Sequence, residues 1–146
     1  MNQETTMALE VRRIINAPPD AVFRAWTDPE KLKRWSCPED ATVGDVVVDL
    51  RVGGKYRIRM KGGTGKTHTA FGVYREIERP HRLVYTWDWE EDESRMGETV
   101  VTVTFNEQGP KTEVVLTHEM FPGPEVRDGH AQGWESLLNQ LERIFV

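Results

Sequence analysis

The chain has 146 residues, of which 29% are charged and 38% apolar, and its formal net charge at pH 7 is −5. This length predicts a single domain spanning residues 1–146. An acidic chain argues against a nucleic-acid partner, because binding to phosphates requires a basic surface. No apolar run approaches the ~20 residues that a membrane span needs, so we expect no membrane span.

The first residues and the cysteine content bear on where the protein resides. The N-terminal sequence has no basic region followed by an apolar core, so we expect no secretory signal. Cys37 is the single cysteine, which excludes an intramolecular disulfide and a zinc site built from cysteines. Together these features predict a cytoplasmic protein.

The first forty residues predict one strand and two short helices. The segment from Ala8 to Ile15 is rich in strand-forming residues. The prolines that follow it cannot continue a strand ladder but suit the start of a helix, so a short helix is predicted from about Asp20. Asp28 is a candidate N-cap, and Pro29 a candidate first residue, of a second short helix.

From residue 43 onward the apolar residues recur with period two, which is typical of antiparallel strands with one buried face. The clearest case is the strand in which Tyr56, Ile58 and Met60 alternate with Lys and Arg. The turn Gly62–Gly65 is interpreted as a hairpin and not as a phosphate loop, because Met60 stands where that motif requires glycine. The predicted strands are Val43–Leu50, Lys55–Lys61, Thr67–Glu78, Leu83–Trp89, Gly97–Phe105 and Val114–His118.

The last stretch, from about Asp128 to Phe145, has the spacing of an amphipathic helix with a broad apolar face. The chain therefore predicts an α+β fold: a curved antiparallel sheet of six to seven strands, two short helices after the first strand, and a long C-terminal helix across the concave face. A straight helix and a curved sheet do not match along their whole length, so a pocket between them is expected.

Several segments resemble the signature of the Hsp90 ATPase activator homologue 1-like (AHSA1-like) family. They are Phe23–Glu30, Asp49–Arg57, Gly72–Ile77 and Arg82–Trp87, and the similarity extends from about Val11 to Phe145. This family belongs to the START-like, or SRPBCC, superfamily, so the resemblance implies a helix-grip fold like that of START and Bet v 1 proteins. It implies no single activity, because the superfamily includes lipid and hormone carriers, polyketide cyclases and co-chaperone domains.

The candidate ligand-binding residues are aromatic, histidine and methionine side chains that we expect to border the pocket. They are Trp35, Tyr56, Met60, His68, Tyr74, Trp87, His118, His130 and Trp134. His118 lies on the inward side of its predicted strand, and His130 lies one helical turn before Trp134. Whether His68 and Tyr74 face the pocket depends on strand parity, because a bulge at Gly72 would reverse it.

Three functions follow from this interpretation. The first is binding of a small hydrophobic or aromatic molecule. The alternative is a cyclase- or hydrolase-like enzyme that uses His118 or His130 as acid or base. However, no catalytic set, metal-binding spacing or cofactor loop can be assembled, so neither catalytic residues nor a cofactor nor a metal is predicted.

The third function, interaction with an Hsp90-type chaperone, is implied by the resemblance alone. The resemblance also implies that the activator has an additional N-terminal domain, for which we expect no room in 146 residues, so this function is not expected. The oligomeric state stays open, with a homodimer among the options.

Overall fold

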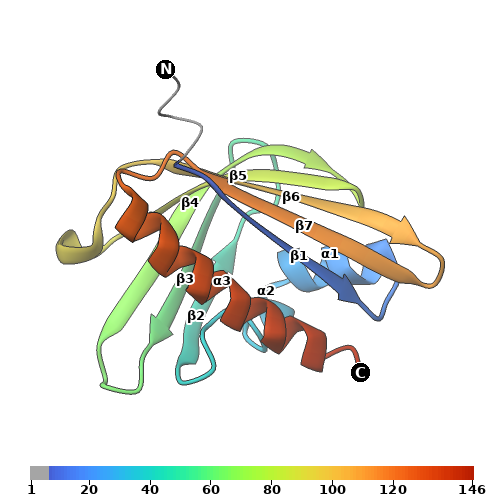
Figure 1. Ribbon diagram of the computed structural model, residues 1–146, viewed down its shortest axis with the longest axis horizontal. Coiled ribbons are helices and arrows are strands. Elements are labelled where there is room, and N and C mark those ends of the chain that lie inside the picture. The colour runs from blue at the N-terminus through green and yellow to red at the C-terminus, as the bar shows by residue number, and fades with distance from the viewer. Residues whose placement is uncertain (1–6) are drawn as a thin grey trace.

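The computed structural model describes residues 7–146, which form one seven-stranded antiparallel sheet with helices packed against it. Figure 1 shows the sheet curled, with the long helix α3 running diagonally across one of its faces. The predicted absence of a secretory signal concerns residues that lie mostly outside this range. The predicted α+β, helix-grip architecture is confirmed.

The elements follow the predicted order. The strands are β1 (Leu9–Ile15), β2 (Thr42–Val48), β3 (Lys55–Lys61), β4 (Thr67–Glu78), β5 (Arg82–Trp89), β6 (Thr99–Gln108) and β7 (Lys111–Glu119). The helices are α1 (Pro19–Thr27), α2 (Pro29–Leu32), the 3-10 helix η2 (Asp92–Ser94) and α3 (Pro124–Arg143). The strand order in the sheet is β1-β7-β6-β5-β4-β3-β2, so the first strand lies beside the last and β2 forms the opposite edge.

Each of the two short helices begins at a proline, Pro19 in α1 and Pro29 in α2. The carboxylate of Asp28 accepts a hydrogen bond from the backbone N–H of Glu30 at 2.9 Å, which confirms the predicted N-cap of α2. Helix α1 buries Phe23 and Trp26, whose rings contact Phe105 of β6 edge-on at 5.4 and 5.7 Å. These aromatic contacts attach α1 to the sheet.

The inner face of β4 is unbroken from His68 to Tyr74, which settles the parity that the sequence left open. The register shift against β5 lies between Tyr74 and Glu76 and not at Gly72. His68 pairs directly with the buried Met60 of β3, and directly opposed residues in a sheet share a face. Gly72 has another role, because a Cβ atom there would lie 2.0 Å from the carbonyl oxygen of Thr86.

Helix α3 begins four residues before the predicted Asp128, and its two halves differ. In the C-terminal half Leu138 and Leu141 are fully buried. In the N-terminal half Gly129 and Gly133 have no atom within 4 Å of where a Cβ would stand. The helix is therefore closely packed towards its C-terminal end and leaves open space beside its beginning.

Candidate functional site

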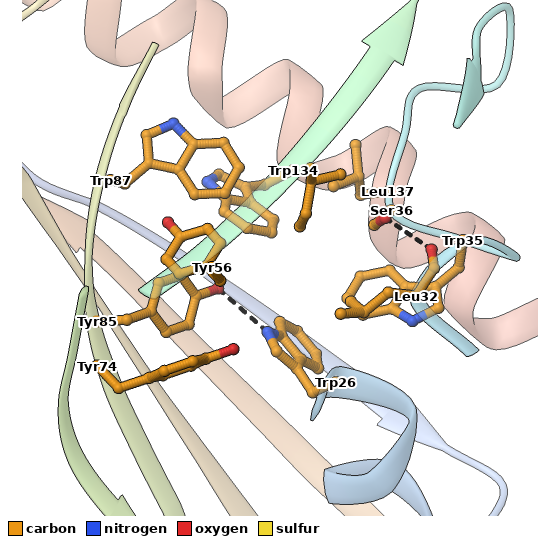
Figure 2. Close-up of a pocket in the computed structure, with 11 residues that line it drawn as sticks. Trp26, Leu32, Trp35, Ser36, Tyr56, Tyr74, Tyr85, Trp87, Trp134 and Leu137 are labelled. Carbon is orange, nitrogen blue, oxygen red and sulfur yellow. Dashed lines mark hydrogen bonds between the residues drawn. The ribbon is translucent and has the colours of Figure 1, made fainter. Parts of the chain in front are cut away.

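The space enclosed by α3, the short helices and the sheet is almost filled by side chains. What remains is an inner void of about 20 Å³, close to the volume that one water molecule needs (Figure 2). It is lined by Trp26, Leu32, Trp35, Ser36, Tyr56, Ile58, Tyr74, Tyr85, Trp87, Trp134 and Leu137. An organic ligand does not fit there unless these side chains move.

Several polar groups around the inner void are engaged within the protein. The hydroxyl of Tyr56 donates to the carbonyl of Thr86 at 2.6 Å, and the indole nitrogen of Trp26 donates to the hydroxyl of Tyr85 at 3.1 Å. Burial raises the pKa of Tyr56, Tyr74 and Tyr85, so all three hydroxyls remain neutral in the physiological pH range. These groups stabilise the core.

An open groove runs along the N-terminal half of α3 and has a volume of about 330 Å³, which lies within the range of ligand sites. It is lined by Pro38, Met60, Trp87, Trp89, Glu125, Val126, Gly129, His130, Gly133, Trp134 and Leu137. Most of these side chains are apolar or aromatic. Trp87, Trp134 and Leu137 also border the inner void and so form the wall between the void and the groove.

The groove opens into a wider basin of about 600 Å³. Pro38, Met60, Trp89, Val126 and His130 line both spaces. The remaining lining of the basin is more polar and consists of Asp40, Ala41, Gly62, His68, Glu93, Ser94, Arg95, Met96 and Pro122. The groove thus has an apolar body and a polar opening.

The groove exists because two glycines lie on one side of α3. Gly129 and Gly133 are four residues apart, so they lie on the same helix face, one turn from each other. Glycine within a helix destabilises it by roughly 0.5–1 kcal/mol relative to alanine. Both positions line the groove and neither Cβ position is occupied by a neighbour, so the glycines keep this space free.

His118 lies behind the groove and is fully buried. Its Nδ1 accepts the indole N–H of Trp134 at 3.1 Å. The proton of its ring is therefore on Nε2, which donates to the hydroxyl of Thr99 at 2.7 Å, and that hydroxyl donates to the carbonyl of Trp87 at 2.6 Å. Burial, and secondarily the neighbouring His130, lower the pKa of His118 well below its usual value, so this ring is neutral.

His130 has both ring nitrogens occupied as well. Its Nε2 accepts the indole N–H of Trp89 at 3.0 Å, and its Nδ1 donates to the carbonyl of Val126 at 2.9 Å. Burial lowers the pKa of His130, although the bond to Val126 acts in the opposite direction. His130 therefore fixes the position of Trp89 in the wall of the groove.

These bonds bear on acid–base chemistry. A general base needs a nitrogen within reach of the substrate, whereas both nitrogens of His118 and of His130 are engaged by the protein itself. The Nδ1 atom of His68 lies 3.4 Å from the hydroxyl of Ser94, which is a long distance for a hydrogen bond that would activate that hydroxyl as a nucleophile. The enzyme alternative thus gains no support from this geometry.

Residues 7–146 contain neither a metal-binding cluster nor a membrane-spanning helix. Within that range no three His, Cys, Asp or Glu side chains cluster as a metal ion would require. No helix there has the length and apolar character to cross a membrane.

Trp87 carries the one buried side-chain nitrogen or oxygen in the described part of the chain that has no hydrogen-bond partner. The residue is 5% exposed. Figure 2 shows its indole nitrogen on the side of the ring away from Tyr56 and Tyr85. A buried donor without a partner costs about 1–3 kcal/mol, so it requires an explanation.

The structure distributes the sequence-predicted residues over five places. Trp35, Tyr56 and Tyr74 line the inner void, Met60 and His130 line the groove, Trp87 and Trp134 separate the two spaces, His68 lines the basin, and His118 lies behind the groove. The prediction omitted Trp89, Gly129 and Gly133. The alternation of Trp89 with Trp87, and two glycines one helical turn apart, were signals that could have identified them.

The fold and the groove together define a class. A curled antiparallel sheet that holds a long C-terminal helix, with a ligand-sized groove between them, is the arrangement of helix-grip proteins. The sequence pattern of one family matches residues 16–146. The chain belongs to that family, which is described as Activator of Hsp90 ATPase homolog 1-like protein.

Solved structures support this assignment. Protein CV1439 from Chromobacterium violaceum is 27% identical, with a TM-score of 0.85 over 95% of this chain and 96% of that one. The AHSA1 protein from Silicibacter pomeroyi is 27% identical, with a TM-score of 0.83 over 93% and 95%. The AHSA1-like protein from Aeromonas hydrophila is 25% identical, with a TM-score of 0.76 over 94% and 90%. No curated protein matches the chain.

Proposed function

We propose that the protein binds a small hydrophobic or aromatic molecule in the groove beside the N-terminal half of α3. The observation that carries this proposal is an open space of about 330 Å³ with a mainly apolar lining. The sequence predicted a pocket between the C-terminal helix and the sheet. Two spaces lie there, and because the inner void offers only about 20 Å³, the proposed site is the groove.

The make-up of α3 supports this choice. Gly129 and Gly133 reduce helix stability although a Cβ atom at either position would meet no neighbour within 4 Å, so they are difficult to explain by folding alone. They are explained if the space beside them is occupied by a ligand. Stability lost in favour of a binding surface is a common compromise in natural proteins.

Two variants of α3 test the proposal, one that places a side chain in the groove and one that serves as its matched control. Gly133→Leu places an apolar side chain in the open space, whereas Gln132→Leu adds the same side chain at an exposed position of the same helix. Naphthalene derivatives serve as probes, and binding is measured by calorimetry and by NMR shifts of the tryptophan indole groups. We expect binding to the wild type and to Gln132→Leu, and at least tenfold weaker binding to Gly133→Leu.

Two results would contradict the proposal. One is that the probes do not bind the wild type at concentrations up to their solubility. The other is that Gly133→Leu, while folded, binds them as tightly as Gln132→Leu does. The first result removes the site, and the second places it elsewhere.

We also propose a cytoplasmic location, on the basis of the single thiol. Cys37 is buried and unpaired, which suits a reducing compartment. Fractionation of cells that express the protein, followed by immunoblotting, tests this, and recovery from an oxidising compartment would contradict it.

A further inference from the structure

We propose that the groove selects neutral, flat apolar molecules that carry a carbonyl oxygen, and that this oxygen accepts the hydrogen bond of the Trp87 indole nitrogen. This inference rests on the proposed function and specifies the chemistry of its ligand. It starts from a difference among the five tryptophans of the chain.

The other four tryptophans each have a partner for the indole N–H. Trp26 donates to Tyr85, Trp35 to the carbonyl of Ala25, Trp89 to His130 and Trp134 to His118, at distances between 2.9 and 3.1 Å. The fold therefore provides a hydrogen-bond acceptor for each of these four indole N–H groups. Trp87, which lies in the wall of the groove, is the exception.

The Trp87 ring is held in place on several sides. It packs against Trp134 at 5.2 Å and against Trp89 at 5.5 Å, the latter edge-to-face. Its own carbonyl accepts the hydroxyl of Thr99. A fixed donor loses little freedom when a ligand accepts its hydrogen, and such preorganisation favours binding.

In this proposal the ligand reaches the donor by way of Trp89, whose ring lies 5.5 Å from that of Trp87. The Trp87 nitrogen is covered in the free protein, whereas Trp89 is half-buried and lines both the groove and the basin. A ligand that displaces the Trp89 ring breaks the hydrogen bond between Trp89 and His130 and takes up the position next to Trp87. Its flat body then replaces one aromatic contact with another, and its oxygen supplies the missing acceptor.

The charges around the groove disfavour an anionic ligand. Among the described residues that line the groove, the one charged side chain is the carboxylate of Glu125. The basin adds Asp40, and also Glu93, which is paired with Lys66 at 2.7 Å. The single Arg or Lys that lines the basin, Arg95, is bonded to the carbonyl of Glu90 and paired with Asp92 at 3.6 Å. A carboxylate ligand would meet repulsion without a free cation to offset it.

Three probes of nearly equal shape test this chemistry: 2-acetylnaphthalene, 2-ethylnaphthalene and 2-naphthoate. Calorimetry with the wild type is expected to give a Kd for the ketone about two- to tenfold lower than for the hydrocarbon, the range that one hydrogen bond supplies. The naphthoate is expected to bind more weakly than both. In Trp87→Phe, which lacks the donor, the ratio of the Kd for the ketone to the Kd for the hydrocarbon should approach one.

An independent measurement on the wild type avoids dependence on how well Trp87→Phe folds. The indole N–H resonance of Trp87 is expected to move downfield with the ketone and to move less with the hydrocarbon. If the ketone and the hydrocarbon bind equally, or the naphthoate binds best, or the Trp87 resonance does not distinguish them, the carbonyl inference is wrong while the groove remains a site. If none of the three probes binds, the proposed function fails as well.

Discussion

The indole nitrogen of Trp134 donates a hydrogen bond to Nδ1 of His118 at 3.1 Å, which joins the long helix to the last strand inside the core. Two further hydrogen bonds link the His118 ring to the hydroxyl of Thr99 and that hydroxyl to the carbonyl of Trp87. A neutral imidazole thus connects α3, β7, β6 and β5. Because the chain of bonds needs Nδ1 without a proton, it depends on pH.

Stability is therefore expected to fall on mild acidification. The pKa of His118 is lowered in the folded state, whereas the unfolded chain has the ordinary value near 6.5, so the unfolded state binds more protons between these two values. The contribution of His118 to the free energy of unfolding is therefore fully present above pH 6.5. It decreases below that pH, by up to about 1.4 kcal/mol per pH unit for this one histidine. Urea unfolding between pH 7.5 and 5.0 measures the slope.

His118→Gln is expected to be less stable at pH 7.5 and to show a flatter slope over that range. His81→Gln, at an exposed turn position, is the matched control and should keep the slope of the wild type. Acidic residues whose pKa is lowered, such as Glu90, act in a lower window, below about pH 4.5. Equal slopes for the wild type and His118→Gln would show that the bond is not the pH-sensitive element.

The bond between Trp89 and His130 predicts a second pH effect, in the wall of the groove. Protonation of Nε2 of His130 removes the acceptor for the Trp89 indole N–H. Because burial lowers the pKa of His130, the transition is expected below pH 6.5. The Trp89 indole resonance should move upfield and exchange faster with water through this transition, and an unchanged resonance down to pH 5.0 would contradict the prediction.

Gly129→Ala is expected to raise the free energy of unfolding by about 0.5–1 kcal/mol, because alanine restricts the unfolded chain and favours the helix. The new methyl group meets no neighbour within 4 Å. Chemical denaturation measures the change. A loss of stability would mean that the groove is closed in solution.

Gly72→Ala is the opposite case and is expected to destabilise the protein by about 1–3 kcal/mol, the usual range for overpacking. The added carbon would lie 2.0 Å from the carbonyl oxygen of Thr86, which also accepts the Tyr56 hydroxyl. Denaturation under the same conditions as for Gly129→Ala gives a direct comparison. If Gly72→Ala were neutral, the close approach of β4 and β5 would not be a feature of the folded protein.

The fold could be predicted because its signals are local. Period two in segments such as Lys55–Lys61, the prolines before α1 and α2, and the spacing of Trp134, Leu137 and Leu141 each depend on a few neighbouring residues. The sequence pattern placed the start of the last helix four residues too late, because Pro124 and the residues just after it carry little apolar signal. That error left Glu125 and Val126 out of the candidate site.

The site could be predicted only in part, because it depends on how side chains fill space. The sequence predicted that Tyr56, Tyr74 and Trp35 border a pocket but could not show that these side chains fill it to within about 20 Å³. Nor could it show that His118 is bonded at both ring nitrogens, because Trp134 and Thr99 are 16 and 19 residues away along the chain. Such contacts are set by the tertiary arrangement alone.

The unequal halves of α3 have a consequence for engineering. The leucines that stabilise the fold lie at positions 138 and 141, whereas the groove is bordered by positions 125, 129 and 133. Substitutions confined to these three positions would therefore change the lining of the groove while leaving the stabilising contacts intact. If the groove binds the ligand class proposed above, the helix is a starting point for the design of sensors for new aromatic analytes.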